Sequence, residues 1–293
     1  MKANLHLHSR ISDGTEWPAE VALRAYRTGL EWVALTDHDT LGGVDEFQRA
    51  ALKLGLKTTA AVEIDCTAPE IGYRSELLAY FPQGHYEHTK ALLREVTKRR
   101  LEYVRSSIRK AQCHFVKSQV SFENLLNHKR QGRPELPPEA FSFNKIDMFL
   151  YFKAHGIIAQ DVSYRAFKKA YLDTGLLSGL PYEKPSCADV IRMVHADGGL
   201  VVLPHIGHEF EDSIQYIKAN QKVWKSTLDY FSSLGLDGIE LYWYRNGDTE
   251  AINRLVVSEA EKRHLRITYG SDCHGPGSGK ETMELFWGEL KEL

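Results

Sequence analysis

The sequence lacks an excess of charge of one sign, long hydrophobic runs and any ordered set of cysteines. Its 37 basic and 39 acidic residues leave a net charge of -2, so we expect no binding to duplex DNA or to an anionic membrane. Apolar runs such as residues 200–203 have the length of a strand and are too short to span a bilayer. The N-terminus turns polar at once, so no signal peptide is expected, and the four cysteines are scattered. These absences predict a cytoplasmic protein with reduced cysteines.

Apolar, strand-like segments alternate with helical patterns at both ends of the chain. The predicted strands cover residues 3–7, 32–36, 58–64, 77–81, 200–204, 238–241 and 266–269. The predicted helices between them cover residues 18–28, 44–54, 187–196, 222–234 and 249–263. Strands and helices in repeated alternation are typical of an α/β sheet or barrel, and 293 residues with 43% hydrophobic content suffice for a sizeable core.

The middle of the chain, about residues 85–181, has a different pattern. Strand signals fade there, and residues 87–112 place apolar side chains at spacings of three and four, which predicts an amphipathic helix. Further helices are predicted at residues 145–154 and 164–172. We interpret this part as a helical insertion over the mouth of a barrel, within a single domain (1–293) that is formed by residues 1–84 and 182–293.

Histidines and acidic residues stand at the ends of the predicted strands. His6 and His8 are two positions apart, so on a strand both side chains point to the same face. Such a pair alone is more often two ordinary half-buried histidines than a metal site. The other strand ends and the loops after them add similar residues: Asp13, Asp37, His38, Asp39, Glu63, His205, Asp272 and His274. Because the strand ends of a βα barrel converge on one mouth, the whole set predicts a metal centre.

Several of these residues lie in short motifs that are similar to those of a known family. The motifs are NLHLHS (4–9), SDGT (12–15), ALTDHDT (34–40), GIE (238–240) and GSDCHG (270–275). With them the whole chain resembles the PHP (polymerase and histidinol phosphatase) superfamily, and within it the branch of small stand-alone phosphoesterases. The resemblance implies a distorted seven-stranded, TIM-like βα barrel with a helical insertion. It also implies two or three divalent ions of manganese, iron or zinc.

The resemblance assigns ligands to each ion. The ligands of the first ion would be His6, His8, Glu63 and Asp272. Glu63 would bridge to a second ion, which His205 and the residue at position 76 would also hold. The ligands of the third ion would be Asp13, His38 and His274. Asp37 and Asp39 would orient the imidazoles, since metal-bound histidines usually need such partners.

The charges of such a centre indicate its chemistry. Adjacent cations neutralise the charge that builds up on phosphate oxygens during an in-line displacement. A water molecule between two ions loses a proton near neutral pH, so a metal-bridging hydroxide can act as the nucleophile. The leaving oxygen needs a proton, for which His205 and His208 are the candidates, and Asp37 is a further candidate for a catalytic role.

Two features depart from the pattern of the family that the chain resembles. Relatives usually have a histidine where this chain has Glu76, whose carboxylate could bind the second ion or lie at the surface. Relatives also have arginines as phosphate anchors, at positions where this chain has Lys145 and His208. Arg10 and Arg245 lie near the predicted mouth and, with Lys145, are the candidates for substrate binding.

Together these observations predict a metal-dependent phosphoesterase. Its expected substrate is a small phosphomonoester, with a nucleotide or a short oligonucleotide as the preferred types. Two alternatives stay open, because the phosphate anchors and position 76 depart from the family pattern. One is a metallohydrolase that acts on a bond other than a phosphate ester, and the other is a non-catalytic metal-binding protein.

Overall fold

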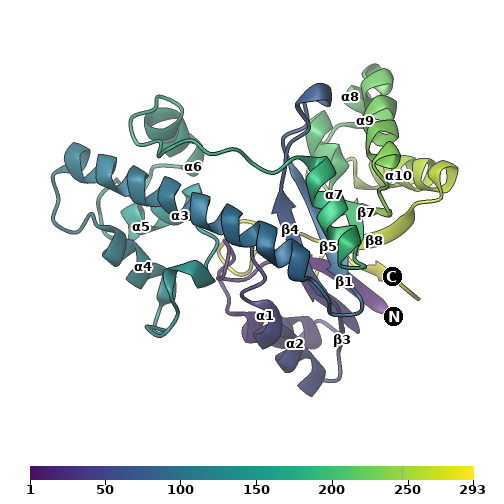
Figure 1. Ribbon diagram of the computed structural model, residues 1–293, viewed down its shortest axis with the longest axis horizontal. Coiled ribbons are helices and arrows are strands. Elements are labelled where there is room, and N and C mark those ends of the chain that lie inside the picture. Colours follow the sequence, from purple (N-terminus) through teal and green to yellow (C-terminus); the bar gives the residue numbers. More distant parts are fainter. Residues whose placement is uncertain (246) are drawn as a thin grey trace. The chain divides into compact units, whose positions relative to one another are not determined.

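The computed structural model describes residues 1–245 and 247–293, which form two compact units (Figure 1). Unit 1 comprises Met1–Leu92 and Lys184–Leu293, and unit 2 comprises Leu93–Glu183. Helix α3 (Glu87–Phe115) begins in unit 1 and continues in unit 2. The boundaries lie close to those predicted for a helical insertion, and the placement of that part over a barrel mouth stays a prediction.

The first sheet of unit 1 has the strand order β3-β2-β1-β9. Strand β1 (Lys2–Leu7) is parallel to β2 (Trp32–Leu35), and β2 is parallel to β3 (Lys57–Thr58). The short β9 (Gly288–Glu289) pairs antiparallel with β1, so the C-terminal segment lies beside the N-terminal strand.

Helices α1 (Pro18–Arg27) and α2 (Val44–Lys53) connect these strands, and crossovers of this kind make neighbouring strands parallel. Pro18 suits the first turn of α1 because its missing N–H would have no partner inside the helix. Glu20 also stabilises this end, since its carboxylate accepts a hydrogen bond from the Trp17 N–H at 2.7 Å. Both helices pack their apolar faces on residues of β1 and β2 (Figure 1).

The second sheet of unit 1 has the order β4-β5-β6-β7-β8. Its strands are β4 (Ala60–Asp65), β5 (Glu76–Phe81), β6 (Leu200–Leu203), β7 (Gly238–Tyr242) and β8 (Arg266–Gly270). Strand β5 is antiparallel to both of its neighbours, whereas β6, β7 and β8 are parallel. The connection from β4 to β5 holds only the short 3₁₀ turn η1 (Pro69–Ile71), so the chain turns back beside the strand it has just left.

Longer helical connections join the parallel strands of this sheet. Turn η4 (Ile206–Phe210), α8 (Ile214–Ala219) and α9 (Gln221–Ser233) follow β6, and α10 (Thr249–Arg263) follows β7. Helix α7 (Cys187–Ala196) precedes β6. Ser186 caps its N-terminus, since the Ser186 Oγ accepts a hydrogen bond from the Asp189 N–H.

The expected α/β class is confirmed, but the ladders differ from a closed seven-stranded barrel. Within the described residues the strands form sheets of four and five members. Single parallel bridges, Leu7 with Cys273 and His38 with Glu63, link the ends of strands from the two sheets. Strand β5 runs antiparallel to both of its neighbours, and the sequence did not predict this direction, because a short apolar segment does not show in which direction its strand runs.

The core of unit 1 explains why the two sheets lie together. Val33 and Leu35 of β2 pack with α1 and α2, whereas Trp32 and Ala34 pack with residues of the second sheet such as Tyr80. Alternate residues of one strand therefore bury two different faces.

The regular secondary structure of unit 2, residues 93–183, is helical, and loops connect its helices. It contains the rest of α3, then α4 (Phe122–Arg130), η2 (Pro138–Ala140), α5 (Lys145–Ala154), α6 (Tyr164–Phe167) and the π turn η3 (Lys168–Leu172). Aromatic rings fill its interior; the rings of Phe149 and Phe167, for example, have centroids 5.5 Å apart.

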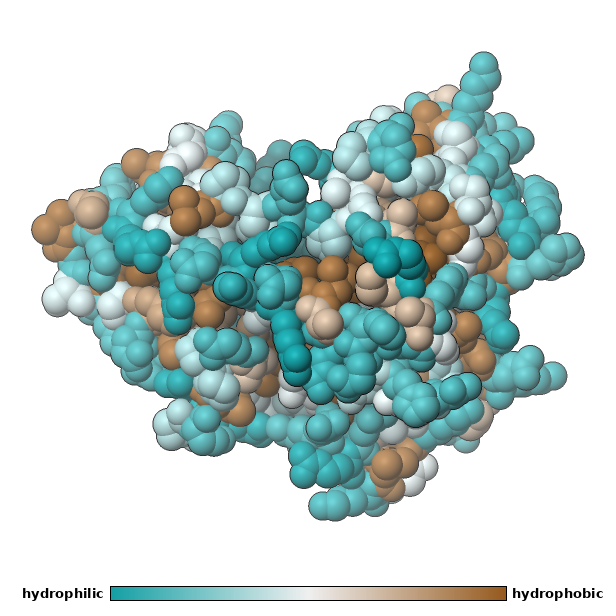
Figure 2. All heavy atoms as spheres, viewed as in Figure 1, coloured by the Kyte–Doolittle hydropathy of each residue, from teal (hydrophilic) through white to brown (hydrophobic). Residues whose placement is uncertain are grey.

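The surface fits the balanced composition. The face drawn in Figure 2 is mainly hydrophilic, with hydrophobic residues in scattered groups. No helix in the described parts of the chain is both long and apolar enough to cross a bilayer.

Candidate metal centre

The end of β1 begins the metal centre. His6 lies in β1 and His8 follows it directly, and the two ring centroids are 5.1 Å apart. Both side chains are fully buried. Buried imidazoles need polar partners, and the ends of other strands supply them.

Four buried side chains form what we call the buried group: His6, His8, Glu63 and Asp272. Nε2 of His6 and Nε2 of His8 each lie 3.3 Å from Oε2 of Glu63. Nε2 of His8 also lies 3.1 Å from Oδ1 of Asp272, and Nε2 of His6 lies 3.7 Å from the same oxygen. The structure thus brings together the four residues expected to hold the first ion.

The facing atoms of the buried group have the properties of metal ligands. Nε2 of both histidines, Oε2 of Glu63 and Oδ1 of Asp272 are buried and form no hydrogen bond to any described residue. An unpaired buried polar atom costs about 1–3 kcal/mol. Ligand atoms about 2.1 Å from one ion lie roughly 3.0–3.5 Å from each other, which is close to the observed spacing. This donor set therefore fits a divalent cation.

The second group consists of Glu63, Glu76 and His205, and we call it the Glu76 group. Nε2 of His205 lies 3.2 Å from Oε1 of Glu63, so the two oxygens of Glu63 face different groups. Glu76 is half-buried and accepts a hydrogen bond from the Ser75 hydroxyl at 2.5 Å. Its carboxylate lies beside the centre and is not a fully solvated surface group.

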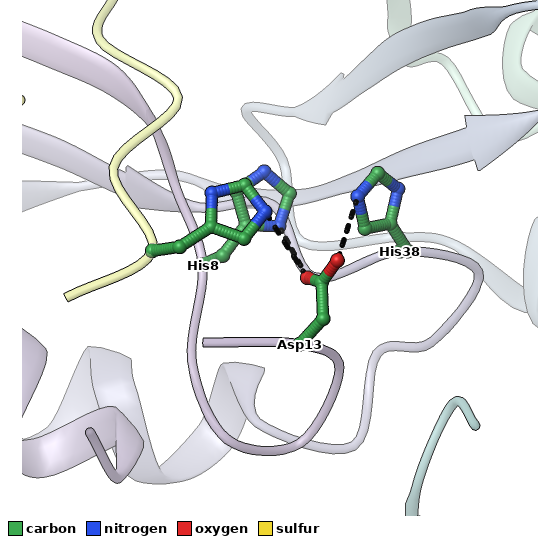
Figure 3. Close-up of side chains that lie close together, drawn as sticks. His8, Asp13 and His38 are labelled. Carbon is green, nitrogen blue, oxygen red and sulfur yellow. Dashed lines mark ion pairs between the residues drawn. The ribbon is translucent and has the colours of Figure 1, made fainter. Parts of the chain in front are cut away.

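The third group, the Asp13 group, consists of His8, Asp13, His38 and His274. The Asp13 carboxylate points towards the rings of His8 and His38 (Figure 3). Its Oδ1 lies 3.2 Å from Nε2 of His274, and its Oδ2 lies 3.7 Å from Nε2 of His38. The structure also places the predicted third set together, with His8 between it and the buried group.

Three residues at this centre have left-handed backbone conformations that are uncommon for residues other than glycine. The φ angles are 25° for His205 and 51° for both Asp39 and Asp272. Each residue follows a strand end, where the chain must turn sharply. Such strained backbone persists only where its surroundings hold it in place, and it gathers at functional sites.

Glu240 is the residue that orients His6. Its Oε1 lies 2.9 Å from Nδ1 of His6, and its Oε2 accepts a hydrogen bond from the His205 N–H at 3.2 Å. The carboxylate is completely buried. Gly270 leaves the space for it, because a Cβ there would collide with Oε1 of Glu240. The GIE motif contained this residue, but no role was predicted for it; a lone acid in an apolar strand was the available signal.

Asp37 and Asp39 hold the backbone next to the centre, and the imidazole-orienting role expected from the resemblance stays a prediction. Asp37 accepts hydrogen bonds from the N–H and the hydroxyl of Ser9 at 2.7 and 2.6 Å, and from the Ser12 hydroxyl at 2.6 Å. It therefore fixes the turn that carries Asp13. Asp39 accepts a hydrogen bond from the Asp65 N–H at 2.9 Å and so holds the end of β4.

The buried charges shift each other's proton affinity. Burial by itself lowers the pKa of His8, but the adjacent carboxylates of Asp272 and Glu63 raise it to about 10. Burial also lowers the pKa of His6, yet Glu240 and Glu63 bring it well above its usual value. Conversely, burial raises the pKa of Glu63, and the imidazoles of His6 and His38 outweigh this and hold it well below its usual range. The positive charge of the protonated histidines balances the negative charge of the carboxylates, and a metal cation can replace these protons.

The predicted proton donors lie side by side. The ring centroids of His205 and His208 are 4.8 Å apart. His205 is buried and faces Glu63, whereas His208 is 35% exposed and its Nδ1 lies 2.5 Å from Oδ1 of Asp212. His208 thus has an oriented ring that reaches solvent.

The three residues predicted to bind substrate contact backbone oxygens or an aromatic ring of this chain. Arg10 donates to the backbone oxygen of Thr15 at 2.8 Å, and Arg245 donates to the backbone oxygen of Gly279. Lys145 belongs to unit 2, where its Nζ lies 5.7 Å from the centre of the Tyr103 ring.

Asp65 and Lys280 are charged residues at the centre that the sequence did not single out. Asp65 forms a fourth group with His38 and Glu76, the Asp65 group, and its Oδ2 lies 3.1 Å from Nζ of Lys184. Lys280 Nζ lies 2.5 Å from Oδ2 of Asp272. The position of Asp65 two residues after Glu63 on a strand, and hence on the same face, was a usable signal.

Comparison with known proteins agrees with this geometry. A 5'-3' exoribonuclease of Haemophilus influenzae is 27% identical over 275 residues, which cover 94% of this chain and 90% of that protein. A 3',5'-nucleoside bisphosphate phosphatase of Chromobacterium violaceum is 25% identical over 280 residues, which cover 94% of this chain and 88% of that protein. A solved structure from Bifidobacterium adolescentis, described as a metal-dependent phosphoesterase, matches with a TM-score of 0.70 and 26% identity over 94% of this chain and 88% of that one.

The family assignment rests on a direct match as well. The family model described as PHP domain matches residues 4–160, which is more than half of the 293 residues. The matched part contains His6, His8, Asp13, His38 and Glu63. The predicted family is confirmed, as is the expectation of an enzyme of the metal-dependent phosphoesterase class. The chain belongs to the PHP domain family.

Proposed function

We propose that this protein hydrolyses phosphate esters of nucleotide type, such as nucleoside phosphates or short oligonucleotides, with the help of two or three divalent ions. The observation that carries this proposal is the position of Glu63, whose two oxygens face two different sets of imidazoles. A carboxylate placed in this way suits two adjacent cations. When bound, such ions activate water and neutralise the charge of phosphate oxygens.

The residues that would hold the ions come from three of the groups. The buried group would hold the first ion, the Glu76 group the second and the Asp13 group the third. Mixed imidazole and carboxylate donors suit Mn, Fe(II) or Zn. Glu76 in place of a histidine adds a negative charge and an oxygen donor, so the second position favours a harder ion such as Mn.

His208 is the better candidate for donating a proton to the leaving oxygen. His205 faces Glu63 and is buried, which suits a ligand, whereas His208 is partly exposed next to it. Asp212 holds the orientation of the His208 ring, because its Oδ1 lies 2.5 Å from Nδ1 of the imidazole. Asp37 acts indirectly in this proposal, through the turn that carries Asp13.

The names of the relatives support the substrate class. The exoribonuclease and the nucleoside bisphosphate phosphatase act on phosphate esters of nucleotides, as their names state. A further relative from Eggerthella lenta, 25% identical over 94% of this chain and 95% of its own length, is named phosphoribosyl 1,2-cyclic phosphate 1,2-diphosphodiesterase. A phosphate ester of a nucleotide or a sugar is common to the substrates of the three proteins.

The test is hydrolysis by Mn-loaded protein of three substrates: phosphate release is measured for a 3',5'-nucleoside bisphosphate and for p-nitrophenyl phosphate, and mononucleotide release is measured for a short oligoribonucleotide. We expect release from at least one nucleotide substrate, its loss in His8→Ala and no change in His85→Ala. His85 is an exposed histidine away from all four groups and serves as the matched control. If the protein holds metal and hydrolyses none of the three substrates, the proposal is wrong and hydrolysis of another bond becomes the leading alternative.

A further inference from the structure

The two oxygens of Asp272 have opposite surroundings. Oδ1 faces His6 and His8 in the buried group and forms no hydrogen bond to a described residue. Oδ2 lies 2.5 Å from Nζ of Lys280 and 3.4 Å from the hydroxyl of Tyr242, which is a buried side chain. Asp272 can therefore offer one oxygen to a cation while the other oxygen is held in place.

The backbone around Lys280 is well fixed. The His274 N–H donates to the backbone oxygen of Lys280 at 3.0 Å, so the loop between them closes on a member of the Asp13 group. Within the loop, the Lys280 N–H donates to the Ser278 hydroxyl, and this hydroxyl donates to the Gly275 oxygen at 2.6 Å. Arg245 adds a bond to the oxygen of Gly279. Lys280 is thus held at the edge of the metal centre.

Lys280 also reaches solvent. Its side chain is 48% exposed, while the carboxylate it contacts is almost fully buried. An ammonium group has three N–H donors, and the contact with Asp272 uses one of them. The remaining donors are available to an anion that arrives from solvent next to the buried group. Lysine is a common phosphate ligand and acts as a point charge.

We propose that Lys280 binds the phosphate group of the substrate next to the buried group. This inference rests on the proposed function. It assigns to Lys280 the anchoring role that the sequence suggested for Arg10, Arg245 and Lys145, two of which donate to backbone oxygens. A point charge restrains the orientation of a phosphate less than a bidentate arginine does, so the site should accept phosphate groups in more than one orientation.

The experiment compares wild-type protein with Lys280→Gln, Lys280→Arg and the control Lys53→Gln, all loaded with Mn²⁺. Lys53 is exposed in the last turn of α2. Three quantities are measured: bound manganese per chain, the Kd for inorganic phosphate by calorimetry, and kcat and KM for the substrate found active. We expect Lys280→Gln to keep its manganese, to bind phosphate about 10- to 100-fold more weakly and to show a raised KM. Lys280→Arg should recover much of the affinity, and Lys53→Gln should match the wild type.

Two results would overturn the inference: unchanged phosphate affinity in Lys280→Gln, or loss of manganese that alone accounts for the weaker binding. Failure of the proposed function would look different. In that case the wild type hydrolyses no phosphate ester, while its binding of inorganic phosphate still depends on Lys280.

Discussion

The buried group and the Asp65 group are both clusters of imidazoles and carboxylates, but the structure stabilises them differently. In the buried group the side chains are at most 3% exposed, and the facing atoms have no hydrogen bonds to described residues. In the Asp65 group, His38 and Asp65 are 14% and 15% exposed, and Lys184 lies beside Asp65. A cation would satisfy the facing atoms of the buried group, whereas the Asp65 group already has a lysine and contact with solvent.

This difference predicts an order of metal binding. An ion at the buried group would relieve several unpaired polar atoms at once, so its affinity should be the highest. An ion near Glu76 and Asp65 should bind with lower affinity, because solvent and the Lys184 ammonium group already offset the negative charge there. The following changes test the contrast, beginning with the one that should have the largest effect.

Glu63→Gln should have the largest effect. Glu63 faces both the buried group and the Glu76 group, so a neutral side chain weakens two ion positions together. We expect loss of more than one ion per chain and a fall in activity of at least about 10³-fold. Metal analysis by mass spectrometry and a phosphate release assay measure both. Wild-type metal content in this variant would refute the bridging position of Glu63.

Glu76→Ala should remove one ion and leave the other positions filled. Only the Glu76 and Asp65 groups contain this side chain. We expect a loss of one ion per chain and a fall in activity of about 100-fold. Glu76→His, which keeps a metal-binding side chain at this position, should restore the ion. An unchanged ion count in Glu76→Ala would instead assign Glu76 to charge balance alone.

Glu240→Gln should weaken metal binding without removing a ligand. The variant keeps the shape of the side chain but loses the charge that orients His6 and contacts the backbone of His205. Loss of such a partner usually costs about 10- to 100-fold in metal affinity or activity. Competition with a chelator of known affinity gives the change. Equal affinity in both proteins would mean that burial alone holds His6 in place.

The smallest expected effect is a dependence of metal affinity on pH. Carboxylates raise the pKa of His8 to about 10 against the effect of burial, so the metal-free chain carries this proton at neutral pH. A metal ligand must be neutral, so binding releases the proton, and affinity should rise with pH by up to about tenfold per unit. Calorimetry in buffers of different ionisation enthalpy measures the released protons. A binding enthalpy that is the same in all buffers would contradict this.

Much of the centre could be predicted because strands have a simple geometry. The two-residue spacing of His6 and His8, and the acids and histidines at later strand ends, follow directly from strand periodicity. Those residues do lie together in the structure. The α/β class followed from the same alternation of segments.

Other features depend on contacts that no local pattern encodes. The direction of β5 depends on a connection too short to hold a full helix. The partners of Asp37 are hydroxyl groups of its neighbouring turn, and the partner of His6 comes from β7, far away in sequence. Lys280 lies after a glycine-rich loop, where no periodicity predicts the direction of a side chain. The nearness of Cys66 and Cys187, whose Sγ atoms are 3.3 Å apart, was likewise invisible among scattered cysteines.

The most direct test of the central claim is anomalous diffraction from crystals of this protein grown with Mn²⁺. From the bridging position of Glu63 we expect at least two manganese peaks near this residue, one beside His6 and His8 and the other beside His205 and Glu76. A single peak, or peaks that do not lie on opposite oxygens of Glu63, would contradict it.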